Sequence, residues 1–138
     1  MQFMQKSGCN GILLATTLAL AACAGMQSQP PEEQVRSLAD KRWQALLAQD
    51  YSTAYNSLTP SYRKIKSLEA YQTMQKSIPF KRISAKVMKV ECAEEKCSAR
   101  VALEGTPVGA FGYKGTVTSG VEETWVLEGG QWWFLEQL

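Results

Sequence analysis

The pattern of apolar and polar positions predicts one long helix near the start of the folded part of the chain. From Glu32 to Leu47 the apolar residues recur every three or four positions, which is the spacing of one helical face. Glu32 and Glu33 lie at the expected N-terminus, where negative charge suits the helix dipole. The apolar stripe comprises Val35, Leu38, Ala39, Trp43, Leu46 and Leu47.

Two shorter helices are predicted after this one. Asp50 is a typical N-cap residue and predicts a helix over 51–58, which Thr59-Pro60 is expected to end. Ser67 is a second candidate cap, for a helix over 68–75. The sequence therefore predicts three helices in the first half of the domain.

After Pro79 the period changes to that of β-strands. In 82–92 the apolar residues change parity near Val87, which predicts a β-bulge there. The segment 97–104 alternates regularly. Strands are also expected over 116–128 and 131–138, joined by Gly129-Gly130, a strong hairpin signal because glycine readily adopts positive φ. Helices followed by antiparallel strands predict an α+β domain.

A two-residue turn in the last hairpin also fixes which side chains face one another. Trp125 then faces Phe134, and Glu123 faces Glu136, on the side that is richer in large apolar groups. Opposed carboxylates on an apolar face raise the proton affinity of one member, so Glu123 and Glu136 are the candidate catalytic residues. A cation such as Arg100 between them, or a longer turn, is the competing interpretation.

The other side of this hairpin carries Val126, Trp133 and Leu135. An exposed apolar patch of this kind marks an interface, so Trp133 is a candidate contact for a second copy of the chain or for another envelope protein. The glycine-rich stretch 105–115 is expected to loosen a sheet edge, or to act as a mobile lid.

The first residues have the order of a secretory signal. Lys6 precedes an apolar run from Gly11 to Ala22, and Cys23 follows directly. A transmembrane anchor is the alternative, but twelve residues at about 1.5 Å each span ~18 Å, against a hydrocarbon core of ~30 Å.

The stretch Leu20-Ala21-Ala22-Cys23 resembles the lipobox of bacterial lipoproteins. The resemblance implies a signal peptide over 1–22, acylation of Cys23 with fatty acids such as palmitate, and a tether over 23–31. Ala24 follows the lipidated cysteine, and in well-studied systems the absence of aspartate there directs lipoproteins to the outer membrane, here facing the periplasm. The bilayer is thus the first expected partner.

Cys92 and Cys97 are the cysteines left for the folded domain, because Cys9 leaves with the signal and Cys23 takes the lipid. In an oxidising compartment we expect them to form a disulfide between neighbouring strands. The chain has no histidine, so we expect no metal site, and no motif indicates a cofactor.

Charge is nearly balanced over the chain, but it is unevenly distributed. The net charge is +2, and becomes +1 once Lys6 is removed with the signal, which argues against a general nucleic-acid binder. Segment 60–90 carries a net charge of +7. It is expected to form a solvated basic face, or a face directed towards anionic head groups.

Segments 43–63, 67–71 and 128–135 resemble the nuclear transport factor 2-like superfamily, which includes ketosteroid isomerase-like proteins. They contain Trp43-x2-Leu46-Leu47-x2-Asp50-Tyr51-x2-Ala54-Tyr55-x2-Leu58-Thr59-Pro60-x-Tyr62-Arg63, Ser67-Leu68-Glu69-Ala70-Tyr71 and Glu-Gly-Gly-Gln-Trp-Trp-Phe-Leu. The resemblance covers 32–138. It implies a cone in which the N-terminal helices pack in the concave face of a curved antiparallel sheet, often with an apolar pocket and often dimeric.

Three functions follow as hypotheses. We expect a binding domain without catalysis, holding a small apolar or lipid-like molecule in a pocket near Trp125 and Phe134. An assembly module that uses the outer sheet face is the second hypothesis. A small lyase or isomerase using Glu123 or Glu136 is the third.

Overall fold

The computed structural model describes residues 29–109 and 112–137. The predicted signal peptide and the lipobox with Cys23 lie outside these residues, as does most of the predicted tether. None of the helices in the described ranges is long and apolar enough to cross a membrane. The elements are α1 (Pro31–Leu47), α2 (Tyr51–Asn56), α3 (Pro60–Ile65), α4 (Leu68–Ser77), β1 (Phe80–Ala93), β2 (Lys96–Pro107), β3 (Val117–Glu128) and β4 (Gln131–Phe134).

The short helices begin at side-chain caps. The Asp50 carboxylate accepts a hydrogen bond from the Thr53 amide at 3.1 Å, and the Ser67 hydroxyl accepts one from the Ala70 amide at 3.2 Å. Both predicted caps are confirmed. Thr59-Pro60 is predicted only to end a helix. In the structure Thr59 also caps α3, a helix that the pattern does not predict. Proline is favourable at the first helical position, where its missing N–H would have no partner.

The four strands form one antiparallel sheet in the order β1-β2-β3-β4. The register between β1 and β2 shifts twice, between Arg82 and Ser84 and between Val87 and Lys89, so the predicted bulge near Val87 is present. Gly129 and Gly130 have φ of 60° and 78° and form the tight turn between β3 and β4. The predicted pairing of Trp125 with Phe134 is observed.

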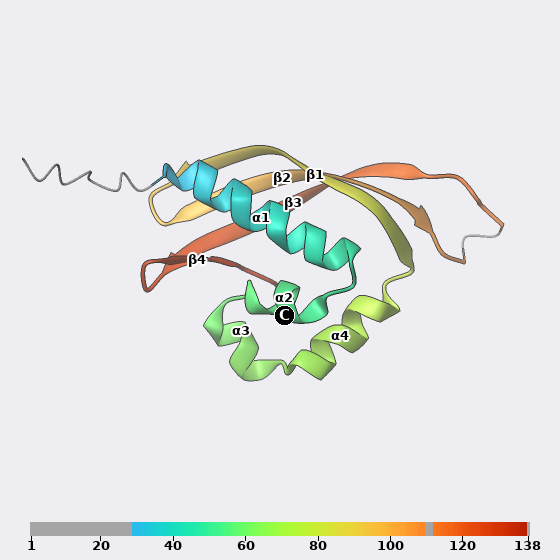
Figure 1. The fold of residues 1–138 in the computed structure, drawn as a ribbon, viewed down its shortest axis with the longest axis horizontal. Coiled ribbons are helices and arrows are strands. Elements are labelled where there is room, and N and C mark those ends of the chain that lie inside the picture. Colours follow the sequence, from blue (N-terminus) through green and yellow to red (C-terminus); the bar gives the residue numbers. More distant parts are fainter. Residues whose placement is uncertain (1–28, 110–111, 138) are drawn as a thin grey trace, which may run out of the picture.

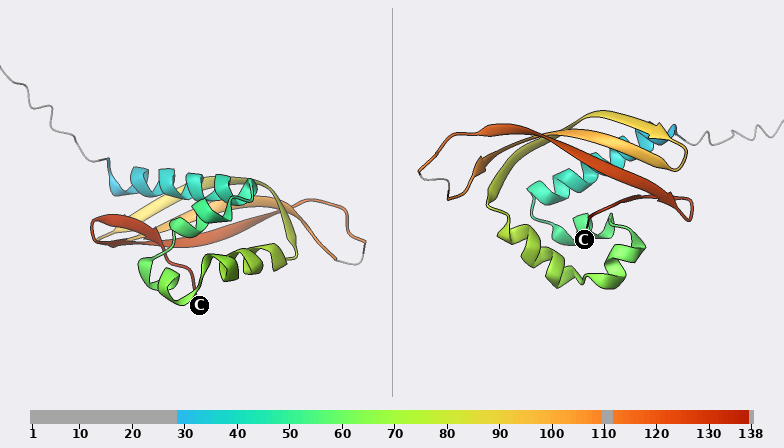
Figure 2. Two further views of the ribbon diagram at one scale, coloured as in Figure 1. Left: turned by 60° about the horizontal axis from the view of Figure 1, so that its bottom comes forward. Right: turned by 180° about the vertical axis from the view of Figure 1, so that it is seen from behind.

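The sheet curls around the helices, and α1 lies along its concave face, as Figures 1 and 2 show. α3 and α4 form the layer farther from the sheet (Figure 1). The predicted α+β class, with helices in the concave face of a curved antiparallel sheet, is therefore confirmed. The buried core joins one face of α1 with the inner positions of the strands and includes Val35, Ala39, Trp43, Leu46, Leu58, Tyr71, Val101 and Trp125.

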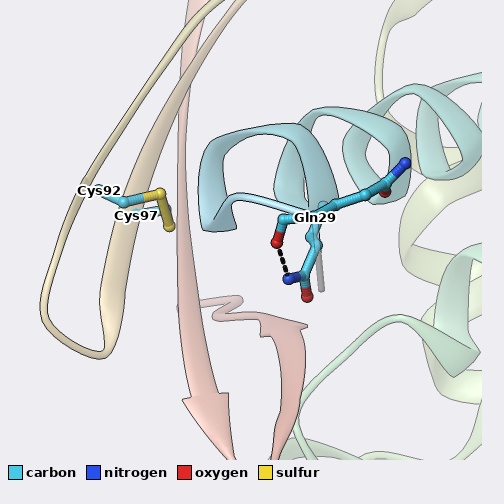
Figure 3. The surroundings of a disulfide bond; sticks show 4 residues. Gln29, Cys92 and Cys97 are labelled. Atoms are coloured by element: carbon cyan, nitrogen blue, oxygen red, sulfur yellow. Dashed lines mark hydrogen bonds between the residues drawn. A yellow bond between two sulfur atoms is a disulfide. The ribbon is translucent and has the colours of Figure 1, made fainter. Parts of the chain in front are cut away.

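Cys92 and Cys97 pair directly across β1 and β2 and are joined by a disulfide (Figure 3). The bond closes the hairpin next to its turn, where Glu94 adopts a φ of 54°. Cys97 is fully buried in the core. The disulfide therefore fixes the end of the β1–β2 hairpin against the rest of the domain.

Strand β4 is shorter than predicted and ends at Phe134 instead of residue 138. One further backbone bond to β3 follows, from the Leu135 amide to the Thr124 carbonyl at 2.8 Å. The backbone of Phe134 also bonds to the loop before α3: its N–H donates to the Ser57 carbonyl at 2.8 Å, and its carbonyl accepts from the Thr59 amide at 3.1 Å. This loop occupies the outer edge of β4. Beyond β4 the chain leaves the sheet, and Glu136 lies towards the interior.

Candidate functional site

A buried ion pair lies between α1 and β3. Arg42 Nη1 donates to Glu123 Oε1 at 2.6 Å, and the side chains are 4% and 1% exposed. The second carboxylate oxygen of Glu123 accepts a hydrogen bond from Trp125 Nε1 at 3.1 Å. The Arg42 guanidinium lies over the Phe134 ring, 3.8 Å from its centroid. Such a pair persists in the interior because each charge has its partner.

Arg42 also approaches the second predicted carboxylate. Its Nη2 lies 3.8 Å from Glu136 Oε2, and the Glu136 side chain is 24% exposed. The predicted pairing of Glu123 with Glu136 across the hairpin is not observed, because β4 ends at Phe134, but both carboxylates lie beside one cation. That cation is Arg42, whereas the sequence interpretation named Arg100. Arg100 lies on the outer face and pairs there with the exposed Glu122.

Arg42 stands out in the sequence by its position on an apolar helix face. It lies three residues after Ala39 and four before Leu46, so it falls on the apolar stripe of α1. A charged residue at such a position is expected to be paired, since an isolated buried charge is costly.

Burial governs the proton affinity of both carboxyl groups. Desolvation raises the pKa of Glu123 above its usual value, and the Arg42 charge and the Trp125 hydrogen bond oppose this. Desolvation likewise raises the pKa of Glu136, again against the effect of Arg42. Glu123 is held by two donors, whereas Glu136 is half-buried and has a looser contact. Glu136 is therefore the more available of the two for proton transfer.

A cavity of about 440 Å³ opens beside this cluster. Arg42 and Trp43 from α1, Gln75 from α4 and Arg82 from β1 line it, together with Phe134. Residues 121–124 and 135–137 complete the wall. The resemblance implies an apolar pocket, but this cavity combines apolar side chains with the charged groups of the cluster.

Several buried donors in this region have no acceptor among the described residues. They are Arg42 Nε, Trp43 Nε1 and the Tyr71 hydroxyl. Trp43 Nε1 lies near the Glu123 carboxylate and the Tyr71 hydroxyl near Arg42, but neither contact has normal hydrogen-bond geometry. Burial raises the pKa of Tyr71, and the charges of Arg42, Glu136 and Arg82 also act on it, so the hydroxyl belongs to the same cluster. A raised pKa keeps the phenol protonated, and it therefore remains a donor. Native interiors contain few unpaired groups of this kind, and each requires an explanation.

The predicted pocket and interface residues lie in different environments. Trp125 is fully buried in the core and also borders a second groove, of about 500 Å³, between α1, α2 and the β3–β4 hairpin. Trp133 is half-buried on the outer side. There its Nε1 donates to the Glu128 carbonyl, and the Arg63 guanidinium lies 5.0 Å from its ring centroid.

Comparisons with known proteins identify the fold. No protein-family model matches the sequence, and a search of curated proteins finds no match. Similar solved structures include an NTF2-like protein of unknown function from Pseudomonas putida KT2440, with 14% identity, a TM-score of 0.54, and coverage of 78% of this chain and 83% of that chain.

Two SEC-C motif containing proteins are also similar. One, from Rhodopseudomonas palustris, shares 12% identity at a TM-score of 0.57 and matches over 72% of this chain and 73% of its own. The other, from Psychrobacter arcticus, shares 13% identity at a TM-score of 0.58 over 80% of this chain. This chain spans 63% of the length of the Psychrobacter protein. At these identities the likeness concerns the fold alone, which is NTF2-like.

Proposed function

We propose that this protein is a lipid-anchored domain of the bacterial envelope that binds a small molecule in the cavity beside Arg42. One observation carries the binding part of the proposal. Arg42 Nε, Trp43 Nε1 and the Tyr71 hydroxyl are buried donors without acceptors in the described chain, and Arg42 and Trp43 line the cavity. A ligand that supplies acceptor oxygens would offset the desolvation of these donors.

The same residues indicate the chemistry of the ligand. Glu123 already occupies Arg42 Nη1, so the ligand meets the remaining donors of the cluster. Phe134 and Leu46 line the same cavity and favour an apolar body. The proposed ligand is thus a small, largely apolar molecule carrying a carbonyl or carboxylate group.

Native mass spectrometry tests this proposal on protein purified from its own envelope. We expect a retained small molecule in the parent protein and its loss in Trp43→Phe, which removes an indole N–H donor from the cavity wall. Trp133→Phe is the matched control, because the Trp133 indole lies outside this cavity and donates to the Glu128 carbonyl. Empty parent protein, or equal ligand loss in both variants, would count against the cavity as the binding site.

The anchor is supported by the lipobox resemblance at 20–23 and is tested separately. A clickable fatty acid fed to the cells should label the parent protein and should not label Cys23→Ser. Cys9→Ser is the control that should retain the label, since Cys9 lies inside the predicted signal peptide. Label in the Cys23→Ser protein would remove the lipoprotein part of the proposal. Fractionation of the two membranes then tests the expected outer-membrane location.

Proton abstraction is a second candidate function, and the exposure of Glu136 favours it. Its carboxylate reaches the cavity wall, has a raised pKa and lies 3.8 Å from Arg42 Nη2, which is the arrangement of a general base beside a stabilising cation. A lyase or isomerase of this kind would exchange a carbon-bound hydrogen of the retained ligand in D₂O. Exchange that persists unchanged in Glu136→Gln would exclude this carboxyl group as the base.

A second copy of the chain is the partner that we propose for the outer sheet face. Val126 and Trp133 pair across β3 and β4 there, and both are half-buried. Trp133→Glu should convert a dimer into a monomer in light scattering. If the parent protein is already monomeric, the interface is absent.

A further inference from the structure

A basic cleft adjoins the cavity beside Arg42 and is lined by residues from the end of α1, the end of α4 and the start of β1. Figure 1 shows how α4 leads into β1. The volume of the cleft is about 350 Å³. Every charged side chain among the described residues that line it is a cation, namely Lys76, Lys81 and Arg82. The remaining lining is apolar or neutral and comprises Leu46, Leu47, Gln49, Tyr51, Gln75, Ile78 and Phe80.

Arg82 is the central cation of this cleft. It is half-buried, and its Nη2 donates to the Gln75 amide oxygen at 2.7 Å. Within the described residues no carboxylate lies within 4.0 Å of its guanidinium, whereas Arg42 has two. Burial and the neighbouring Arg42 charge lower the pKa of Arg82, which is the effect expected for a cation lacking a compensating anion.

The partners of Arg82 are held in place by the fold. Gln75 is 6% exposed, and its oxygen directs the guanidinium from the inner face of α4. Lys76 Nζ lies 5.8 Å from the ring centroid of Tyr51, a cation–π contact that keeps it near the cleft. Lys81 precedes Arg82 on β1 and is exposed. Lys76 and Lys81 also line the cleft, so its planar guanidinium and two further cations are suited to an oxyanion.

We propose that this cleft binds a phosphate group, with Arg82 as the main ligand and Lys76 and Lys81 as flanking contacts. The cleft adjoins the cavity beside Arg42, because Leu46, Gln75, Ile78 and Arg82 border both spaces. The phosphate site rests on the cations of the cleft and not on the ligand proposed for that cavity. The phosphate can belong to a soluble phosphoester or to a phospholipid head group. The basic segment 60–90 thus supplies a defined anion site as well as a solvated face.

Titration of the ¹⁵N-labelled protein with inorganic phosphate tests the site directly. Shifts should appear at the backbone amides around the end of α4 and the start of β1. Arg82→Gln should weaken binding by about tenfold or more, since it removes a charge-assisted contact. The double variant Lys76→Gln/Lys81→Gln should also weaken phosphate binding. It leaves Arg82 and its Gln75 contact intact, so it tests the site even if Arg82→Gln fails to fold.

Lys86→Gln/Lys89→Gln is the matched control, because it removes the same charge from exposed positions of the same strand, away from the cleft. Dihexanoyl phosphatidic acid in a parallel titration identifies the source. Tighter binding of this lipid than of phosphate supports the site with a head group as its ligand, and equal or weaker binding supports it with a soluble ligand. Absence of shifts with either probe, or equal weakening in the control, would overturn the proposal.

Discussion

Replacing Arg42 by methionine tests the central contact of the domain. Arg42 Nη1 lies 2.6 Å from Glu123 Oε1, and neither side chain is more than 4% exposed. Methionine keeps an unbranched apolar chain, so the main change is the lost charge. Removing one partner of a buried pair costs about 3–5 kcal/mol, because the other charge stays buried without a counter-ion. We expect Arg42→Met to lower the free energy of unfolding by this amount.

The double variant Arg42→Met/Glu123→Gln separates the stranded charge from the loss of packing. The glutamine oxygen can still accept the hydrogen bond that Trp125 Nε1 donates to Glu123 at 3.1 Å. With no buried charge left, the double variant should be more stable than Arg42→Met by about 2–3 kcal/mol. Acidification should also stabilise Arg42→Met relative to the parent, because the stranded carboxyl group then takes up a proton.

Urea unfolding followed by tryptophan fluorescence measures these differences, with the slope expected to stay constant. Arg100→Met is the matched control, because it breaks an exposed ion pair with Glu122 on the outer face and should change stability little. A loss below about 1 kcal/mol for Arg42→Met would refute the reasoning. So would a double variant no more stable than Arg42→Met.

Three further predictions concern separate parts of the domain. Glu136→Gln should leave stability nearly unchanged at low pH and become more stable than the parent as pH rises. The folded-state pKa of Glu136 is raised above 4.5, so the parent loses stability as its carboxyl group ionises. A pH series of urea midpoints checks this. Reduction of the β1–β2 disulfide should cost about 2 kcal/mol in the same assay. Gly105→Ala should cost about 1–3 kcal/mol, since its Cβ would lie 2.3 Å from the Phe80 ring, whereas Gly120→Ala meets nothing within 4 Å and serves as its control.

The local features of the fold were predictable because each depends on neighbouring residues. Asp50 and Ser67 cap their helices through amides three positions away. Gly129-Gly130 fixes the register of the last hairpin through the geometry of a two-residue turn. The helix that begins at Pro60 was missed, because proline was interpreted only as a helix end.

The end of β4 could not be derived from alternation alone. Residues after Phe134 continue the strand pattern in sequence, yet the loop before α3 bonds to the backbone of Phe134 and takes the outer edge of the strand. This is a contact between segments far apart in the chain. Glu136 lies beyond the paired residues of β4, so its approach to Arg42 depends on the path of the chain after the strand and not on the hairpin register.

The candidate site arises where two such patterns meet. The stripe of α1 carries Arg42 among apolar residues, and β3 carries Glu123 two positions before the inward-facing Trp125. Either charge would be costly to bury alone. Packing α1 against the curved sheet brings the two charges together, so each compensates for the other. The pairing uses Nη1 of Arg42 and leaves its Nε without an acceptor among the described residues. The contact that stabilises the core therefore also orients the donors to which we assign ligand binding. Loss of binding at Arg42 would consequently be ambiguous, whereas Trp43→Phe removes one donor from the cavity wall and keeps both Arg42 and Glu123.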